Sequence, residues 1–160
     1  MLFTSYAFLI GFLPITLLVY VFLSRFEWFR LAKGWLVFAS LFFYGWWDAR
    51  YLVLLGVSLL VNYFLGKRLL RAPNRLLLIF GLTFNLGALF YFKYSSFFVQ
   101  TLNQVSGAGW IVPHIILPLG ISFFTFQKVA FLVDAYQGKV QSLSFLNYCL
   151  FVTFFPQLIA

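Results

Sequence analysis

The chain has 160 residues, of which 64% are hydrophobic and 9% are charged, and its formal net charge is +8. A soluble core of this size cannot bury so much apolar surface, so the composition excludes an ordinary soluble domain and indicates a membrane protein. The positive charge does not indicate a nucleic-acid partner, because the basic residues form short clusters beside apolar segments and no continuous face.

The first apolar segment covers residues 3–23. A helix needs roughly 20 apolar residues to cross a bilayer, so this segment is long enough. No basic residue precedes it and no small-residue cleavage site follows it, which favours a retained span over a signal peptide. The next two apolar segments, 34–47 and 51–66, are shorter and are separated only by residues 48–50. They predict a tight helical hairpin that crosses a thin region of the membrane or does not fully cross it.

The fourth apolar segment covers residues 76–92 and ends at Lys93. Beyond Ser95, apolar residues at near-helical spacing alternate with polar ones. This pattern predicts a separate amphipathic helix that lies at the membrane interface.

The fifth apolar segment, 110–133, is interrupted by Pro113 and Pro118. It therefore predicts a kinked or discontinuous helix. The sixth begins near Ser144 and is still apolar at Ala160, the last residue. We expect the natural protein to continue beyond this point, so that these segments form an incomplete bundle.

These segments are apolar at odd and even positions alike, whereas strands of a membrane β-barrel alternate polar and apolar residues. We therefore predict an all-α, polytopic transmembrane protein with five to six apolar helices in a single domain. Basic residues gather in two connections that are separated by a nearly neutral turn. They are Arg25, Arg30 and Lys33 in the first connection, and Lys67, Arg68, Arg71 and Arg75 in the third. The positive-inside rule then places the N-terminus outside the cytoplasm.

Reactive side chains are scarce in this chain. One His and one Cys exclude a zinc site built from several such ligands, and we assign no metal site. Cys149 is predicted to be a small buried apolar residue. Ser122, His114 and Asp134 make a triad only on paper, because no nucleophile-elbow spacing surrounds the serine.

Asn62 and Asn85 lie inside apolar segments. Their simplest role is to form hydrogen bonds between helices, and the alternative is that they line a substrate tunnel.

The most informative segment follows the helix break at Pro118. Its polar residues are Ser122, Thr125, Gln127, Lys128 and Asp134. A helix that begins at membrane depth lines a cavity, because the free backbone groups at the break need water or protein partners. Taken singly, the uncharged residues are as readily explained by hydrogen bonds between helices. The two charged residues must reach an interface, a cavity or each other.

Three stretches carry a family resemblance. They read LPLGISFFTFQ at 117–127, LVDAYQG at 132–138 and FFPQLIA at 154–160. Weaker matches are FLP at 12–14, SLFFYGWW at 40–47, Asn62-Tyr63 with Gly66, and FYFKY at 90–94. In this order and combination they resemble the membrane-bound O-acyltransferase family, and within it the alginate O-acetyltransferase and D-alanyl transfer branch. Phe131 stands where a Tyr is common in that family, and Gln137 where an Arg is common.

The resemblance implies an enzyme of the bacterial cytoplasmic membrane that transfers an acyl group, acetyl in the alginate branch, to a hydroxyl of an extracytoplasmic polysaccharide such as alginate. It implies no bound cofactor, an acyl thioester or acyl carrier as co-substrate, and partner proteins of an O-acetylation system. The catalytic His of the family lies downstream, beyond Ala160, so no catalytic residue is assigned here. His114 belongs to a different motif. We expect the 160 residues alone to be inactive.

Within this interpretation, polar side chains after the helix break line a substrate tunnel and aromatic side chains form its rim. The predicted lining residues are Ser122, Gln127 and Asp134, and the predicted rim residues are Tyr94, Trp46 and Trp47. Two alternatives stay open. A transport or lipid-binding subunit would also use a discontinuous helix, and an inactive structural fragment would lack the downstream His.

Overall fold

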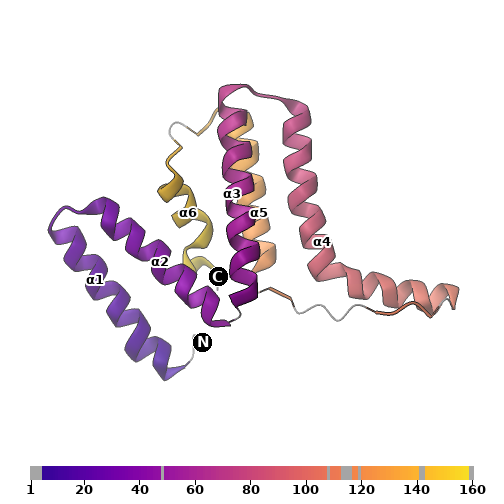
Figure 1. The fold of residues 1–160 in the computed structure, drawn as a ribbon, viewed down its shortest axis with the longest axis horizontal. Helices are drawn as coiled ribbons and strands as arrows, with labels where there is room; N and C mark the ends of the chain where they lie inside the picture. Colours follow the sequence, from indigo (N-terminus) through magenta and orange to yellow (C-terminus); the bar gives the residue numbers. More distant parts are fainter. Residues whose placement is uncertain are drawn as a thin grey trace.

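A computed structural model of the chain describes residues 5–47, 49–107, 109–112, 117–118, 120–140 and 143–158. Within these ranges the chain forms six α-helices, a π-helical turn and a 3-10 helix, without any strand (Figure 1). In chain order they are η1 (Ala7–Phe12), α1 (Leu13–Arg25), α2 (Phe29–Trp47), α3 (Ala49–Arg71), α4 (Arg75–Ser106), α5 (Ile121–Tyr136), α6 (Phe145–Thr153) and η2 (Phe155–Leu158). The all-α prediction is confirmed.

Three helical stretches are long and apolar enough to cross a membrane. They are Ala7–Arg25, which joins η1 to α1, then α3 and α4. The first corresponds to the predicted span at 3–23. The chain is therefore a membrane protein, as its composition predicts.

The first two helices form an antiparallel pair at one side of the molecule, with α1 outermost (Figure 1). We call η1, α1 and α2 the N-terminal arm. The chain reverses between them at Glu27, which has a positive φ of 60°. The indole Nε1–H of Trp35 donates a hydrogen bond to the backbone carbonyl of Thr16 at 3.1 Å, and it ties the two helices together.

The predicted tight hairpin differs from the structure. Helices α2 and α3 have 19 and 23 residues, which is longer than the apolar runs, because both extend over basic residues whose long stems can reach the interface. They diverge from their turn, and α6 contacts both of them (Figure 1). The two helices therefore form a wedge that is filled by a later segment.

Helix α4 is one continuous helix of 32 residues, where the sequence predicted an apolar segment and a separate amphipathic helix. The Asn74 side chain caps its start by accepting hydrogen bonds from the amides of Leu76 and Leu77. Gly107, with a φ of 64°, ends it. The helix bends, and its C-terminal part runs away from the other helices, so the predicted amphipathic segment is present without a break before it (Figure 1).

The predicted interruption before the fifth helix is confirmed. Gly120 has a φ of 68°, a left-handed conformation that favours glycine, and α5 begins at the next residue. Helix α5 packs against α3 and α4. Pro113 and His114 lie outside the described residues. The last helix, α6, begins directly after Ser144, as predicted.

The apolar core lies where α3, α5 and α6 meet, and it includes Cys149, which is buried as predicted. Two glycines allow the helices to approach closely. A Cβ atom on Gly66 of α3 would overlap the Phe131 ring of α5, and one on Gly81 of α4 would lie 2.7 Å from Leu132. Such close approach at small residues is typical of helix packing in membranes.

The two buried asparagines join α3 to α4. Asn62 and Asn85 are 0% and 1% exposed. Asn85 Nδ2 donates to Asn62 Oδ1 at 2.6 Å, and Asn62 Nδ2 donates to Asn85 Oδ1 at 3.2 Å. The predicted hydrogen bond between helices is confirmed.

Candidate functional site

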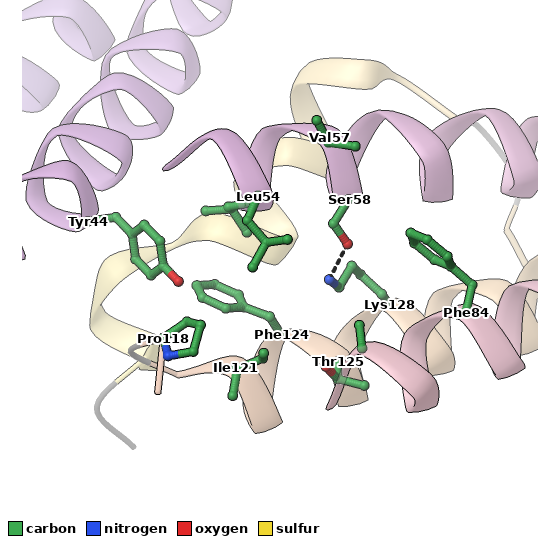
Figure 2. Close-up of a pocket in the computed structure, with 12 residues that line it drawn as sticks. Tyr44, Leu54, Val57, Ser58, Phe84, Pro118, Ile121, Phe124, Thr125 and Lys128 are labelled. Atoms are coloured by element: carbon green, nitrogen blue, oxygen red, sulfur yellow. Dashed lines mark hydrogen bonds between the residues drawn. The ribbon is translucent and has the colours of Figure 1, made fainter. Parts of the chain in front are cut away.

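A small cleft lies between α3, α4 and α5, with the end of α2 at one side (Figure 2). Its volume is about 70 Å³. The residues that line it are Tyr44, Leu54, Leu55, Val57, Ser58, Phe84, Ala88, Pro118, Ile121, Phe124, Thr125 and Lys128. Most of them are apolar, so the few polar groups determine what the cleft can bind.

One face of α5 supplies the wall that carries the charge. Ile121, Phe124, Thr125 and Lys128 follow the i, i+3, i+4, i+7 spacing that places residues on one side of a helix. All four are buried. The helix break at Gly120 sets where this face begins.

Lys128 is the charged group of the cleft. It is only 6% exposed, and its ammonium donates a hydrogen bond to Ser58 Oγ on α3 at 2.5 Å (Figure 2). No acidic side chain described in the structure forms an ion pair with it. An ammonium has three N–H donors, so this single bond leaves donors available. The cleft can therefore bind a carbonyl oxygen or an anionic oxygen.

Tyr44, from the last turns of α2, stands at the other end of the cleft. Its ring meets the Phe124 ring edge-on, with centroids 5.3 Å apart. In Figure 2 its hydroxyl oxygen lies beside Phe124 and near Pro118. Helices α2, α3 and α5 thus contribute two hydroxyls, aromatic rings and an ammonium to one small space.

Two predicted residues, Ser122 and Tyr94, come together outside this cleft. Ser122 is exposed on the outer face of α5 and accepts a hydrogen bond from Lys93 Nζ of α4 at 3.3 Å. The same ammonium lies 5.4 Å from the centre of the Tyr94 ring. These residues form a polar contact on the surface between α4 and α5.

Gln127 is buried and points toward α6. Its Nε2 donates to the carbonyl of Phe151 at 3.1 Å and to Gln157 Oε1 at 3.0 Å. Its own Oε1 is buried without a partner among the described residues. Asp134 is half-buried near the end of α5 and does not pair with Lys128.

Trp46 is 60% exposed at the end of α2, next to Phe42. The side chain of Trp47 lies outside the described residues. Of the predicted site residues, Ser122 and Tyr94 thus lie close together, while Gln127, Asp134 and Trp46 lie apart from them. The roles of all these residues as tunnel lining or rim stay predictions.

Sequence reasoning missed Ser58 and Tyr44, and it treated Lys128 only as a costly charge. A serine inside an apolar segment is the signal that was available for Ser58. In the part of the chain that the structure describes, no three His, Cys, Asp or Glu side chains gather as metal ligands would.

Curated relatives match the chain over its whole length. It is 41% identical to the peptidoglycan O-acetyltransferase of Helicobacter pylori, covering 36% of that protein. It is 36% identical to the probable alginate O-acetylase AlgI of Pseudomonas aeruginosa and 35% identical to that of Azotobacter vinelandii, covering 32% and 33% of them. The chain thus spans about a third of the length of these relatives.

No family model matches the chain, and no solved structure matches it. The family assignment comes from the relatives and from the motifs at 117–127, 132–138 and 154–160. Membrane-crossing helices are in accord with it. Over its whole length the chain is similar to these O-acetylating proteins, and its motifs resemble the membrane-bound O-acyltransferase family.

Proposed function

We propose that the chain is the N-terminal portion of a membrane enzyme that transfers an acetyl group to a hydroxyl of a glycan outside the cytoplasm. The observation that carries this proposal is its similarity, over the whole chain, to proteins named for O-acetylation of peptidoglycan and of alginate. Both named acceptors are glycans that carry free hydroxyls. The acceptor class is therefore a cell-envelope or extracellular polysaccharide.

The reaction is acyl transfer from a thioester or an acyl carrier. The acceptor oxygen forms a bond to the acyl carbon, and the bond from that carbon to the donor breaks. A general base takes the proton of the hydroxyl, and the departing group of the donor is protonated. We expect the histidine that acts as base to lie beyond Ala160, as the family resemblance implies. The described helices would position the acyl group and shield it from water.

The charge distribution supports an orientation in the bacterial cytoplasmic membrane. Most of the basic residues lie in the helix ends beside the turn from α1 to α2 and the turn from α3 to α4, and both turns lie at the far ends of α2 and α3 from the turn that joins these two helices (Figure 1). The positive-inside rule assigns these far ends to the cytoplasm and the N-terminus to the outside. Donor and acceptor would then arrive from opposite faces, with partner proteins presenting them.

The test is to disrupt the gene and restore it as it is naturally encoded, then to measure the acetate that mild base releases from purified cell-envelope glycan. We expect disruption to lower this ester-linked acetate and complementation to restore it. Unchanged ester content in the disrupted strain would contradict the proposal. Expression of residues 1–160 alone is expected to restore nothing, because these residues cover about a third of the relatives.

A transport or lipid-binding subunit is the second candidate, and the discontinuity at Gly120 beside a cleft is the observation that favours it. Reconstitution separates the two. If the purified full-length protein is given donor on one side of the vesicle membrane and glycan on the other, an acyltransferase forms the ester, whereas a transport subunit without a separate enzyme forms none.

A further inference from the structure

We infer that the cleft between α3, α4 and α5 holds the acyl group in transit, that Lys128 Nζ donates a hydrogen bond to its carbonyl oxygen, and that the size of the cleft restricts the group to acetyl. This inference rests on the proposed function and names the substrate pocket within it. It is carried by the volume of the cleft, its apolar walls and a buried ammonium with donors available.

The volume selects a small occupant. A cavity of about 150 Å³ in another protein binds benzene, which has six non-hydrogen atoms. The cleft here measures about 70 Å³, which by proportion holds about three such atoms. An acetyl group has three: a methyl carbon, a carbonyl carbon and an oxygen. A propionyl group adds one methylene, which would have to extend out of the cleft or displace a lining side chain.

The chemistry of the walls selects the same occupant. Leu54, Phe84 and Phe124 offer apolar surface to a methyl group. Lys128, buried at 6% exposure, offers N–H donors to a single oxygen. A hydrocarbon ligand would leave these donors without an acceptor, which is costly in a buried site. A polar group with many oxygens would find too few partners among the apolar walls.

The position of the ammonium also favours a carbonyl oxygen. Ser58 Oγ holds Lys128 Nζ at 2.5 Å from the α3 side, so the charge is fixed at the wall and is not free to extend into solvent (Figure 2). A fixed donor toward the acyl oxygen is useful in acyl transfer, because negative charge develops on that oxygen when the hydroxyl attacks.

Enlarging the cleft tests its role in selecting the acyl group. Leu54→Ala removes part of one wall, and Val53→Ala is its matched control, because Val53 is the preceding residue of α3, is 68% exposed and does not line the cleft. Complemented cells receive ¹³C-labelled acetate and propionate, and the acids released from the glycan by mild base are measured. One methylene in an apolar pocket changes selectivity by about tenfold or more. We expect Leu54→Ala to raise the ratio of propionyl to acetyl esters by about that factor, with Val53→Ala unchanged.

Removing the charge tests the hydrogen bond. Lys128→Met keeps all but one atom of the length of the side chain, and replacing a buried charge by an apolar group does not by itself prevent folding. Lys139→Met, at an exposed position after α5, is the control. A hydrogen bond from a charged donor contributes enough that we expect acetyl esters to fall about ten- to a hundredfold in Lys128→Met at equal membrane protein level. Lys139→Met is expected to retain the original ester content.

The outcomes separate this inference from the proposed function. If the unaltered protein adds no ester to any glycan, the proposed function fails. If the unaltered protein adds acetate but Leu54→Ala keeps the original propionyl-to-acetyl ratio, the cleft does not hold the acyl group. Equal ester content in Lys128→Met and Lys139→Met would likewise overturn the role of the ammonium.

Discussion

The N-terminal arm and the remaining helices, which we call the α3–α6 unit, are held together by different kinds of contact. Between α3, α4 and α5, two glycines allow close approach and buried polar side chains pair across the helices, as in Asn62–Asn85 and Lys128–Ser58. The arm meets the unit mainly through aromatic rings, with Phe8 and Phe43 of the arm packed on Phe155. Two hydrogen bonds add to this contact: Lys33 Nζ donates to Asn147 Oδ1 at 2.9 Å, and the Phe155 amide donates to Ser40 Oγ at 3.2 Å. A groove of about 280 Å³ lies between α1 and α2 themselves.

The kind of contact affects how firmly membrane helices associate, because the lipid around them is as apolar as a leucine side chain. Apolar contact alone therefore gives membrane helices little reason to prefer each other over lipid, whereas close packing at small residues and hydrogen bonds give a specific preference. The α3–α6 unit combines hydrogen bonds with close approach at Gly66 and Gly81, whereas the arm meets it through rings and two hydrogen bonds. We therefore expect the unit to keep its arrangement under conditions that release the arm.

The largest effect is expected from crowding the unit at its closest approach. In Gly66→Val, the new side chain would overlap the Phe131 ring, so α3 and α5 would have to separate. Overpacking of this kind lowers the free energy of unfolding by about 3 kcal/mol. Unfolding of the protein in mild detergent, titrated with a denaturing detergent, measures the change.

A matched glycine lies on the same helix. Nothing comes within 4 Å of a Cβ atom on Gly56, so Gly56→Val should change the free energy of unfolding far less. Phe131→Ala should restore part of the stability that Gly66→Val removes, since it vacates the space. Equal losses in the two glycine variants would show that the close approach does not hold the unit together.

Part of this unit could be predicted from the sequence. Asn62 and Asn85 stood out because an amide inside an apolar helix must find a partner, and each found the other. The break before α5 was visible because Pro118 and Gly120 are local signals. The all-α class followed from apolar runs without alternation.

The rest depended on contacts that sequence patterns do not encode. Lys128 and Ser58 are 70 positions apart, and only the packing of α5 on α3 brings them together. Gln127 is one residue before Lys128, but the helical turn points it toward α6 and not into the cleft. The break expected before the amphipathic segment is absent, because Lys93 and Ser95 continue α4 and their change in polarity does not interrupt the helix.

A double-mutant cycle on the asparagine pair sharpens the comparison. Asn62→Leu and Asn85→Leu each leave the partner amide with fewer hydrogen bonds in the core, and the double variant removes both. Coupling between such groups in membranes is about 1 kcal/mol, so the double variant should cost less than the sum of the single ones by about that amount. Strictly additive losses would mean that the pair does not join α3 to α4.

The smallest effect is expected in the arm. Trp35→Phe keeps an aromatic ring but removes the N–H that bonds the Thr16 carbonyl at 3.1 Å. One neutral hydrogen bond contributes about 1 kcal/mol, so the global free energy of unfolding should change by that amount or less. Hydrogen exchange resolves where the change occurs. Amides of α1 should exchange several times faster in the variant, while those of α3 keep their original rates.

Trp28→Phe provides the control, because Trp28 is 54% exposed in the turn between α1 and α2 and no hydrogen bond of its indole ties the two helices. It should leave exchange in α1 unchanged. If Trp35→Phe instead accelerated exchange in α1 and α3 equally, the arm and the α3–α6 unit would open together. That result would mean that the contacts around Phe155 hold the arm as firmly as the polar pairs hold the unit. If those contacts were weaker, the arm would open alone and exchange in α3 would not change.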